Sequence, residues 1–500
     1  MPTTNSSDDI VPSMSRPSTL SRRHFLGVAA AGVGGALIGC RDGRRRPNIV
    51  FILTDDQRWD CMSCAGHKYL KTPNMDRIAG EGVRFANAFV TDSLCSPSRA
   101  SFLSGLYAHS HGVRNNFTEY PDNLPSYPKA LKAAGYATAY VGKWHMGEAN
   151  DEHRSGFDFW ASHKGQGQYY GTEWNIGGKR QTLDGYYTHV VTDLAVDWIK
   201  SAKRPFAIEI GHKAPHGLWV PEPKYAHAFD QMPVDRPATA TLPPGTPDWV
   251  ARRIKTWHGI DGPLYETNDY GVFRRNYLAT LLSVDDAVGR VFDALNAIGE
   301  LDNTVFVYAG DNGFLLGEHA SIDKRTAWEE SIRIPFLVRY PGMIRSPHVV
   351  DEMVLNMDLA PSLVEIGGGV GFPAVAGRSF VPLLRGERPA GWRKSFLYEY
   401  NFEKEFPYTP NVRAVRTDDW KYIHYPNGGA HADTEKAELY DLKADPIEAK
   451  NLIDDPASQG TLAELRTELD RLLRETGTPS PDPMPENPQL KFEMPEKSIR

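Results

Sequence analysis

The feature that most constrains this chain is an unbroken apolar run that stops at two carboxylates. Residues 48–53, Asn-Ile-Val-Phe-Ile-Leu, are followed by Thr54, Asp55 and Asp56. A strand that is apolar on both of its faces is typical of a parallel sheet covered by helices on both sides. The run therefore predicts a central parallel strand whose carboxyl end carries acidic side chains.

Apolar runs and amphipathic stretches alternate along the following 250 residues. This alternation predicts an α/β fold with a large, mainly parallel sheet sandwiched by helices. We expect strands near residues 83–89, 136–141, 206–210 and 304–308, and helices near residues 73–81, 127–134, 192–200 and 273–299.

Polar side chains follow directly after several of these strands. In open α/β sheets, ligands bind outside the carboxyl ends of the strands, so residues far apart in the sequence meet at one edge. We therefore expect one site at this edge. The residues concerned are Asp55, Asp56, Lys143, His145, His216, Asp311 and Asn312.

The character of the sequence changes after residue 386. Short strands of an antiparallel sheet are expected over residues 395–400, 412–416 and 420–424, and an amphipathic helix over residues 461–474. These elements predict a smaller C-terminal α+β subdomain. The predicted organisation is a signal peptide over residues 1–40, a tether over 41–46, a catalytic domain over 47–386, the subdomain over 387–475 and an extended tail over 476–500.

The first 40 residues have the organisation of an export signal. Ser21-Arg22-Arg23-His24-Phe25-Leu26 precedes a Gly/Ala-rich apolar run over residues 27–39, which is too short to span a bilayer as a helix. The pattern predicts a twin-arginine signal peptide, with a plain secretory signal as the alternative. Residues 37–40 resemble a lipobox in which Cys40 becomes the lipidated first residue. We therefore expect an extracytoplasmic protein, in the periplasm or at the cell surface, that is anchored only through this lipid.

The net charge argues against a nucleic-acid-binding protein, and the cysteines argue against a disulfide-rich or zinc-binding protein. The formal net charge of −7 argues against a nucleic-acid-binding protein, which normally carries a basic face. Four cysteines, at positions 40, 61, 64 and 95, are too few for a disulfide framework. Cys61 and Cys64 form a C-x-x-C motif without the second pair that a zinc site needs. A local disulfide and two separate thiols are the alternatives for this pair.

Cys95 lies in the stretch "DSLCSPSRASFLSG", residues 92–105. Ser96 and Pro97 suit the cap and first turn of a helix, and a helix N-terminus attracts anions. Arg99, four residues after Cys95, projects from the same turn. Cysteine, helix N-terminus and guanidinium together predict a site for an anion.

These motifs resemble those of the type I sulfatases, in which the cysteine is converted to formylglycine. The signature is Cys95-x-Pro97-x-Arg99-x-x-x-Leu103-Ser104-Gly105, with Ser104 where many members have threonine. The supporting motifs are the Asp55-Asp56 strand end, "GKWHMG" at 142–147, "HKAPH" at 212–216, "GDNG" at 310–313, "DKR" at 323–325 and "ELYDL" at 438–442. Together with "HGVRNN", they are most similar to glycan sulfatases of the N-acetylglucosamine-6-sulfatase kind. The resemblance implies an alkaline-phosphatase-like fold.

The resemblance also implies a mechanism. A hydroxyl of the hydrated formylglycine at position 95 attacks the sulfur of a sulfate ester, and loss of the second proton then releases sulfate and restores the aldehyde. Arg99 is expected to hold residue 95, and Lys143 and Lys324 to bind sulfate oxygens. His145 is the expected base that releases sulfate. His216, preferred over His212, is the expected acid on the leaving alcohol.

Metal and substrate ligands follow from the same resemblance. Asp55, Asp56, Asp311 and Asn312 offer only oxygen ligands, which suit Ca²⁺ or Mg²⁺, and residue 95 is expected to join them. Three carboxylates, a divalent cation and three basic side chains sum to a positive site that attracts a sulfate ester. The expected substrate contacts are His111, Arg114, Asn115 and Asn116.

The expected partners are a sulfated carbohydrate and, during maturation, the formylglycine-generating enzyme. Two other functions remain open. A phosphate monoester or phosphonate hydrolase on the same fold would use the same metal site, and its sulfatase-to-phosphatase ratio would identify it. A non-catalytic glycan-binding lipoprotein would keep Cys95 as a thiol.

Overall fold

A computed structural model describes residues 45–427, 430–485 and 490, and these described residues belong to one compact unit. The predicted twin-arginine motif, apolar run and lipobox, together with most of the tether, lie outside the described residues. Within those residues, no helix combines the length and the apolar character needed to cross a bilayer.

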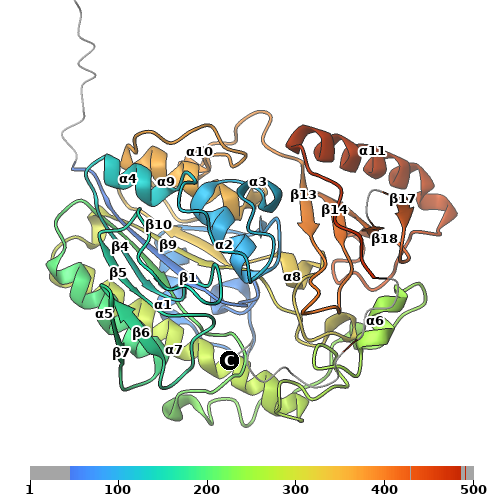
Figure 1. The fold of residues 1–500 in the computed structure, drawn as a ribbon, viewed down its shortest axis with the longest axis horizontal. Helices are drawn as coiled ribbons and strands as arrows, with labels where there is room; N and C mark the ends of the chain where they lie inside the picture. The colour runs from blue at the N-terminus through green and yellow to red at the C-terminus, as the bar shows by residue number, and fades with distance from the viewer. Residues whose placement is uncertain (1–44, 428–429, 486–489, 491–500) are drawn as a thin grey trace, which may run out of the picture. The chain divides into compact units, whose positions relative to one another are not determined.

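A ten-stranded mixed sheet forms the centre of this unit (Figure 1). Its five central strands, β9, β1, β8, β4 and β5, run parallel, and the sheet continues on both sides through an antiparallel neighbour, β10 beside β9 and β6 beside β5. The predicted α/β class is confirmed. In spatial order the strands are β11 (His348–Val350), β2 (Val83–Phe85), β10 (Phe336–Arg339), β9 (Thr304–Gly310), β1 (Asn48–Thr54), β8 (Phe206–Gly211), β4 (Ala137–Gly142), β5 (Phe159–Ser162), β6 (Glu173–Ile176) and β7 (Lys179–Thr182).

Helices cover both faces of the large sheet. Alternate residues of β1 enter two separate hydrophobic clusters, because successive side chains of a strand point to opposite faces. Ile49 and Phe51 pack with one cluster, and Val50 and Ile52 with the other. On the first face lie α2 (Cys95–Ser104), α4 (Tyr127–Ala133) and α9 (Leu359–Gly367); on the second lie α1 (Pro73–Gly80), α5 (Tyr187–Ser201) and α7 (Tyr270–Ala297).

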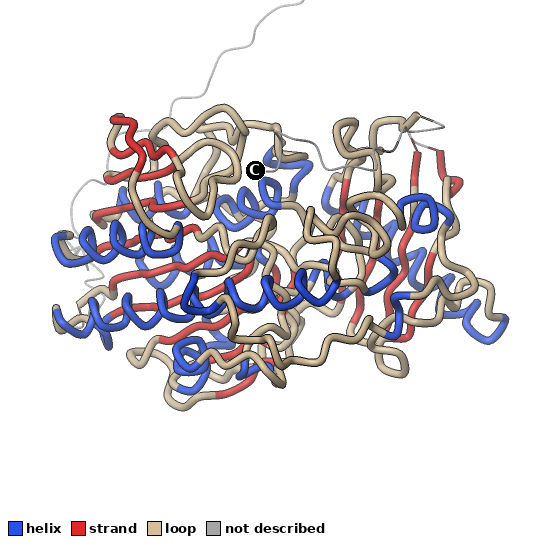
Figure 2. Tube along the Cα trace, turned by 90° about the horizontal axis from the view of Figure 1, so that it is seen from below, coloured by secondary structure: helices blue, strands red, loops and turns tan. Residues whose placement is uncertain are grey.

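The predicted C-terminal antiparallel sheet is present and lies beside the large sheet (Figure 2). Helix α11 (Gln459–Thr476) packs on it through leucines such as Leu465 and Leu469. The predicted boundary at residue 386 falls between α10 (Val381–Leu384) and the first strand of this sheet. Its strands, in order, are β13 (Ser395–Tyr400), β14 (Val412–Thr417), β15 (Trp420–His424) and β18 (Glu438–Asp441).

Short elements complete the described fold. They are α3 (Ala108–His111), α6 (Asp248–Arg253), α8 (Glu329–Ile332), the pair β3 (Ala88–Phe89) and β12 (Val354–Leu355), and the pair β16 (Pro426–Asn427) and β17 (Ala430–Asp433).

Most expected elements lie within a few residues of their predicted positions. The segment 273–299 is one helix, α7, and the apolar segment 83–89 is divided between β2 and β3. Cys61 and Cys64 are separate thiols rather than a disulfide.

The second sheet helps to fix the segment that leads into α2. The Glu399 amide donates to Thr91 O at 2.9 Å, and the hydroxyls of Tyr398 and Ser93 lie 2.6 Å apart. Ser93 is two residues before Cys95, so β13 supports the start of α2.

Candidate active site

Four side chains with oxygen atoms that can bind a metal ion follow the adjacent strands β1 and β9, as predicted. Asp55 and Asp56 follow β1, whose last residue is in register with the last residue of β9. Asp311 and Asn312 follow β9, and all four side chains are buried. The chain turns sharply at Asp56, with φ of 60°, and the Asp56 amide donates to Asp311 Oδ1 at 3.1 Å. The two strand ends are thereby tied into one acidic cluster.

Cys95 is the first residue of α2, and all ten residues of this helix are buried. Its Sγ lies 3.5 Å from Asp55 Oδ1 and 2.9 Å from Lys324 Nζ. The expected Ser96 cap is wrong, because Leu94 is the cap residue and no side chain caps the helix. The Ser96 hydroxyl instead donates to the carbonyl of His145.

Three basic side chains surround the carboxylates. Arg99 donates to Asp311 Oδ2 at 2.9 Å, to Asp55 Oδ2 at 3.2 Å and to the Lys143 carbonyl at 2.7 Å. Lys143 Nζ contacts Asp55 Oδ2, and Lys324 Nζ contacts Asp56 Oδ1. The guanidinium therefore connects both strand ends to the loop after β4.

Burial and neighbouring charges shift the pKa values of these groups. Burial raises the pKa of Asp56 to about 7, with Lys324 opposing it. Burial also opposes ionisation of Asp55, but Lys143 and its other cationic neighbours outweigh it and hold the Asp55 pKa well below its ordinary value. Burial and the Asp55 charge raise the pKa of the Cys95 thiol to about 12. An unmodified Cys95 is therefore a thiol, not a thiolate nucleophile, at neutral pH.

The acidic cluster fits a hard divalent cation. Oxygen atoms of Asp55, Asp56 and Asp311 lie within 4.8 Å of one another, and the buried Asn312 Oδ1 has no hydrogen-bond partner among the described residues. Ca²⁺ and Mg²⁺ prefer such oxygen donors. The Cys95 and His216 ligand atoms lie within the same distance of Asp55.

A second buried group, formed by His319, Glu330 and Glu448, has ligand atoms at similar spacing. Both oxygens of Glu448 already accept hydrogen bonds, from Lys421 Nζ at 2.7 Å and from the Glu329 amide at 2.7 Å. Glu448 is therefore committed to bonds within the protein, and the cluster at β1 and β9 fits a cation better.

Two predicted histidines approach the cluster from different loops. His216 Nε2 lies 3.8 Å from Asp56 Oδ2, and His216 Nδ1 lies 2.6 Å from the Gly217 carbonyl. His145 Nε2 lies 2.8 Å from Glu148 Oε1, and within the part of the chain that the structure describes its buried Nδ1 has no hydrogen-bond partner. Burial, followed by Lys143, lowers the pKa of His145 to about 4 and that of His216 well below its ordinary value. Both lowered pKa values favour the neutral form of these rings at neutral pH.

The alternative histidine, His212, has a different environment. Its backbone amide donates to Leu53 O at 2.8 Å, which continues the pairing of β8 with β1. Burial lowers the pKa of His212 to about 3. The geometry thus favours His216 as the functional residue of "HKAPH".

The four expected substrate residues differ in their surroundings. Asn116 Oδ1 accepts from the Ser96 amide at 3.0 Å, beside Cys95, whereas Arg114 is exposed. Asn115 Oδ1 closes a turn with the Phe117 amide at 3.0 Å. His111 is buried, with Nε2 3.1 Å from Ser101 Oγ and Nδ1 accepting from the Val113 amide at 3.1 Å. Both ring nitrogens of His111 are in use, so we do not include it among the proposed substrate contacts.

Four residues near the site were not identified from the sequence: Glu148, Gln166, Tyr169 and Lys213. Gln166 Oε1 accepts from Lys143 Nζ, and Glu148 is the partner of His145. Gln166 and Tyr169 lie in a loop without periodicity, so no pattern marks them. Lys213 lies inside "HKAPH" and Glu148 just beyond "GKWHMG", so their positions within the motifs were the available signal.

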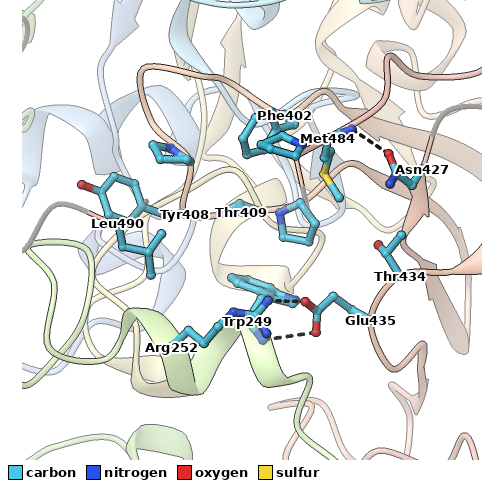
Figure 3. Close-up of a pocket in the computed structure, with 13 residues that line it drawn as sticks. Trp249, Arg252, Phe402, Tyr408, Thr409, Asn427, Thr434, Glu435, Met484 and Leu490 are labelled. Carbon is cyan, nitrogen blue, oxygen red and sulfur yellow. Dashed lines mark hydrogen bonds and ion pairs between the residues drawn. The ribbon is translucent and has the colours of Figure 1, made fainter. Parts of the chain in front are cut away.

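A pocket of about 270 Å³ opens elsewhere, between α6 and the C-terminal sheet (Figure 3). Trp249, Phe402 and Tyr408 supply aromatic walls, and the Arg252–Glu435 ion pair lies at one side. None of the predicted site residues lines this pocket. It is therefore a separate feature from the acidic cluster.

Comparison with known proteins identifies matching families over most of the chain. The family model described as Sulfatase matches residues 47–370. The model described as N-sulphoglucosamine sulphohydrolase, C-terminal, matches residues 317–475.

Individual proteins give consistent matches. The N-acetylglucosamine-6-O-sulfatase of Bacteroides thetaiotaomicron is 34% identical over 94% of this chain and 92% of its own length. The N-acetylglucosamine-6-sulfatase of Homo sapiens is 33% identical over 74% of this chain and 70% of its own length. A solved structure of a protein in complex with its substrate, D-glucosamine-2-N,6-O-disulfate, matches with a TM-score of 0.79 and 32% identity, over 87% of this chain and 99% of that chain.

Proposed function

The chain belongs to the sulfatase family and is a sulfuric ester hydrolase, and from this premise we propose that it removes 6-O-sulfate from N-acetylglucosamine units of sulfated glycans. The names of the relatives support the choice of sugar and sulfate position. The observation that carries the chemistry is Cys95, whose Sγ lies between Asp55 and Lys324 inside a buried cluster of carboxylates and cations.

Residue 95 is proposed to act after conversion of its thiol to formylglycine by the formylglycine-generating enzyme. When hydrated, that group supplies a hydroxyl nucleophile that a buried thiol with a pKa of about 12 does not. The Cys95 Sγ marks where those hydroxyl oxygens would be. Asp55 Oδ1 and Lys324 Nζ, at 3.5 and 2.9 Å, are the groups that would orient them.

Asp55, Asp56, Asp311 and Asn312 are proposed to hold Ca²⁺ or Mg²⁺, and residue 95 to complete the ligand set. The ion would stabilise negative charge on sulfate and on the nucleophile. The unpartnered Asn312 Oδ1 supports this assignment, because a buried oxygen without a hydrogen-bond donor is otherwise costly.

The remaining side chains divide between binding and proton transfer. Arg99 holds the carboxylates in place, and Lys143 and Lys324 bind sulfate oxygens. His145 is neutral at neutral pH, which suits a base that accepts the proton when sulfate leaves residue 95.

His216 is proposed to protonate the leaving alcohol through Nε2, which faces the cluster. The ring is neutral on its own, so Nε2 would take up this proton when the negative charge of a bound sulfate ester raises the His216 pKa. The leaving group of a 6-O-sulfated sugar is an alkoxide, a strong base, so an acid at this position has the most to contribute. Substrate contacts are assigned to Arg114, Asn115 and Asn116.

We further propose that the mature enzyme is extracytoplasmic. The supporting sequence is the arginine pair and the apolar run before Cys40. A lipid on Cys40 would anchor the enzyme to a membrane surface, where sulfated polysaccharides are accessible.

Peptide mass spectrometry tests the central step. Protein from a host that contains the formylglycine-generating enzyme is digested with trypsin, which yields the peptide Phe85–Arg99. We expect an aldehyde in place of the Cys95 thiol, and release of sulfate from N-acetylglucosamine-6-sulfate in preference to its 3-sulfate isomer. Cys95→Ala should remain folded and lose turnover. An intact thiol in fully active protein would refute the mechanism, and preference for the 3-sulfate would refute only the substrate.

A further inference from the structure

Lys213 is a buried lysine that the proposed chemistry does not use. It lies in the loop after β8 and is only 2% exposed. Among the described residues it forms no ion pair with a carboxylate, and burial, followed by Lys143, lowers its pKa to about 7. Burying an ammonium group without a carboxylate partner is unfavourable unless its other contacts compensate for the lost hydration.

The side chains of Lys213 and Tyr169 contact two consecutive carbonyls. Its Nζ donates to the Gly217 carbonyl at 3.3 Å, the same oxygen that lies 2.6 Å from His216 Nδ1. Its Nζ also lies 5.4 Å from the centre of the Tyr169 ring. The Tyr169 hydroxyl in turn donates to the His216 carbonyl at 3.0 Å. Lys213 therefore holds the Gly217 carbonyl, and Tyr169 holds the carbonyl of the residue before it, His216.

This arrangement determines which nitrogen of His216 is available. A carbonyl oxygen can only accept, so His216 Nδ1 must carry a hydrogen. Nε2, 3.8 Å from Asp56 Oδ2, is then the nitrogen that gains or loses a proton when the charge of the ring changes. If the Gly217 carbonyl rotated away, the ring would lose the hydrogen bond that fixes both its tautomer and its orientation.

We propose that Lys213 and Tyr169 are positioning residues for His216, holding the Gly217 and His216 carbonyls so that Nε2 points at the leaving-group oxygen. The inference rests on the proposed role of His216 as the acid. Among the described residues, neither side chain forms a hydrogen bond with Cys95 or with a carboxylate of the cluster, so both are expected to act through the orientation of the ring.

Leaving-group dependence tests this proposal. Wild type, His216→Ala, Lys213→Met and the double variant are assayed with N-acetylglucosamine-6-sulfate and with 4-nitrophenyl sulfate, whose leaving group needs little protonation. Met keeps the length and apolar stem of lysine. For Lys213→Met we expect kcat on the sugar sulfate to fall about 10- to 100-fold with KM nearly unchanged, and kcat on the aryl sulfate to fall less than about 3-fold. The double variant should be no slower than His216→Ala, because residues that act as one unit are not additive.

Control variants separate the possible outcomes. Lys200→Met, on an exposed part of α5, should leave both activities unchanged. Tyr169→Phe keeps the ring and removes only the hydroxyl, so it tests the same arrangement if Lys213→Met does not fold.

The acid role of His216 and the positioning role of Lys213 and Tyr169 can fail separately. One outcome is that His216→Ala loses more activity on the sugar sulfate than on the aryl sulfate, while Lys213→Met and Tyr169→Phe lose activity equally on both esters. That outcome would refute the positioning role and leave the acid role standing. If His216→Ala itself loses activity equally on both esters, both are refuted.

Discussion

We expect the folding stability to depend on pH through one buried carboxyl in the central sheet. Glu209 is in the middle of β8, 3% exposed, and its Oε2 accepts a hydrogen bond from the Tyr127 hydroxyl. Burial raises the Glu209 pKa from its ordinary 4.5 to about 7, against the opposing effects of Tyr127 and Arg99. The native state therefore binds this proton more tightly than the unfolded state does.

The sign and size of the effect follow from proton linkage. Stability from the protonated carboxyl is fully present below pH 4.5 and is lost as the pH rises through about 7. Each pH unit between the two pKa values is worth about 1.4 kcal/mol. Between pH 5 and pH 8 the wild type should therefore lose about 2.5 kcal/mol through this group.

Glu209→Gln removes the titration and keeps an acceptor for Tyr127. We expect the variant and the wild type to have similar free energies of unfolding at pH 5, and the variant to be more stable by about 2.5 kcal/mol at pH 8. Urea unfolding at fixed calcium concentration measures the difference, and Glu152→Gln, at an exposed position, is the control. Parallel pH profiles for Glu209→Gln and wild type would refute the assignment of a raised pKa to Glu209.

Three further substitutions test the site. Asp311→Asn removes one of three carboxylates from the proposed cation site and should weaken Ca²⁺ binding by at least about 10-fold, measured by calorimetry; unchanged affinity would place the ion elsewhere. Gly142→Ala places a Cβ 2.0 Å from the Gly211 carbonyl at φ of 114°, so it should destabilise the protein by more than about 3 kcal/mol; a thermal melt like that of wild type would contradict the close approach. Glu148→Gln removes the charge that raises the pKa of His145, so the acidic limb of the kcat profile should move to lower pH; movement to higher pH would contradict the pairing.

The fold and the centre of the site could be predicted because both depend on short-range patterns. Parallel strands that are apolar on both faces bring their carboxyl ends to one edge, which placed Asp55 and Asp311 together across 256 residues of sequence. The motif around Cys95 was recognisable because Cys95, the start of its helix and Arg99 are close together in the sequence. These features do not require knowledge of tertiary contacts.

The supporting residues could not be predicted because their roles come only from tertiary packing. Gln166 reaches Lys143 from a loop with no periodic pattern. His111 looks like a free polar residue in the sequence, and only the packing of α3 on α2 shows that Ser101 and the Val113 amide occupy its ring. Side chains that orient catalytic groups have no signature of their own, because many polar residues could do the same at a different distance.

The complete burial of α2 has a consequence for the order of events in the life of the protein. Cys95 has no exposed surface, and none of the ten residues of its helix is accessible. A maturation enzyme has to surround a thiol and several flanking residues to oxidise it, and the folded chain offers neither. The proposed conversion of Cys95 therefore belongs to the interval between synthesis and folding. A chain that folds too early is expected to stay a stable but inactive thiol form, which no later exposure to that enzyme would rescue.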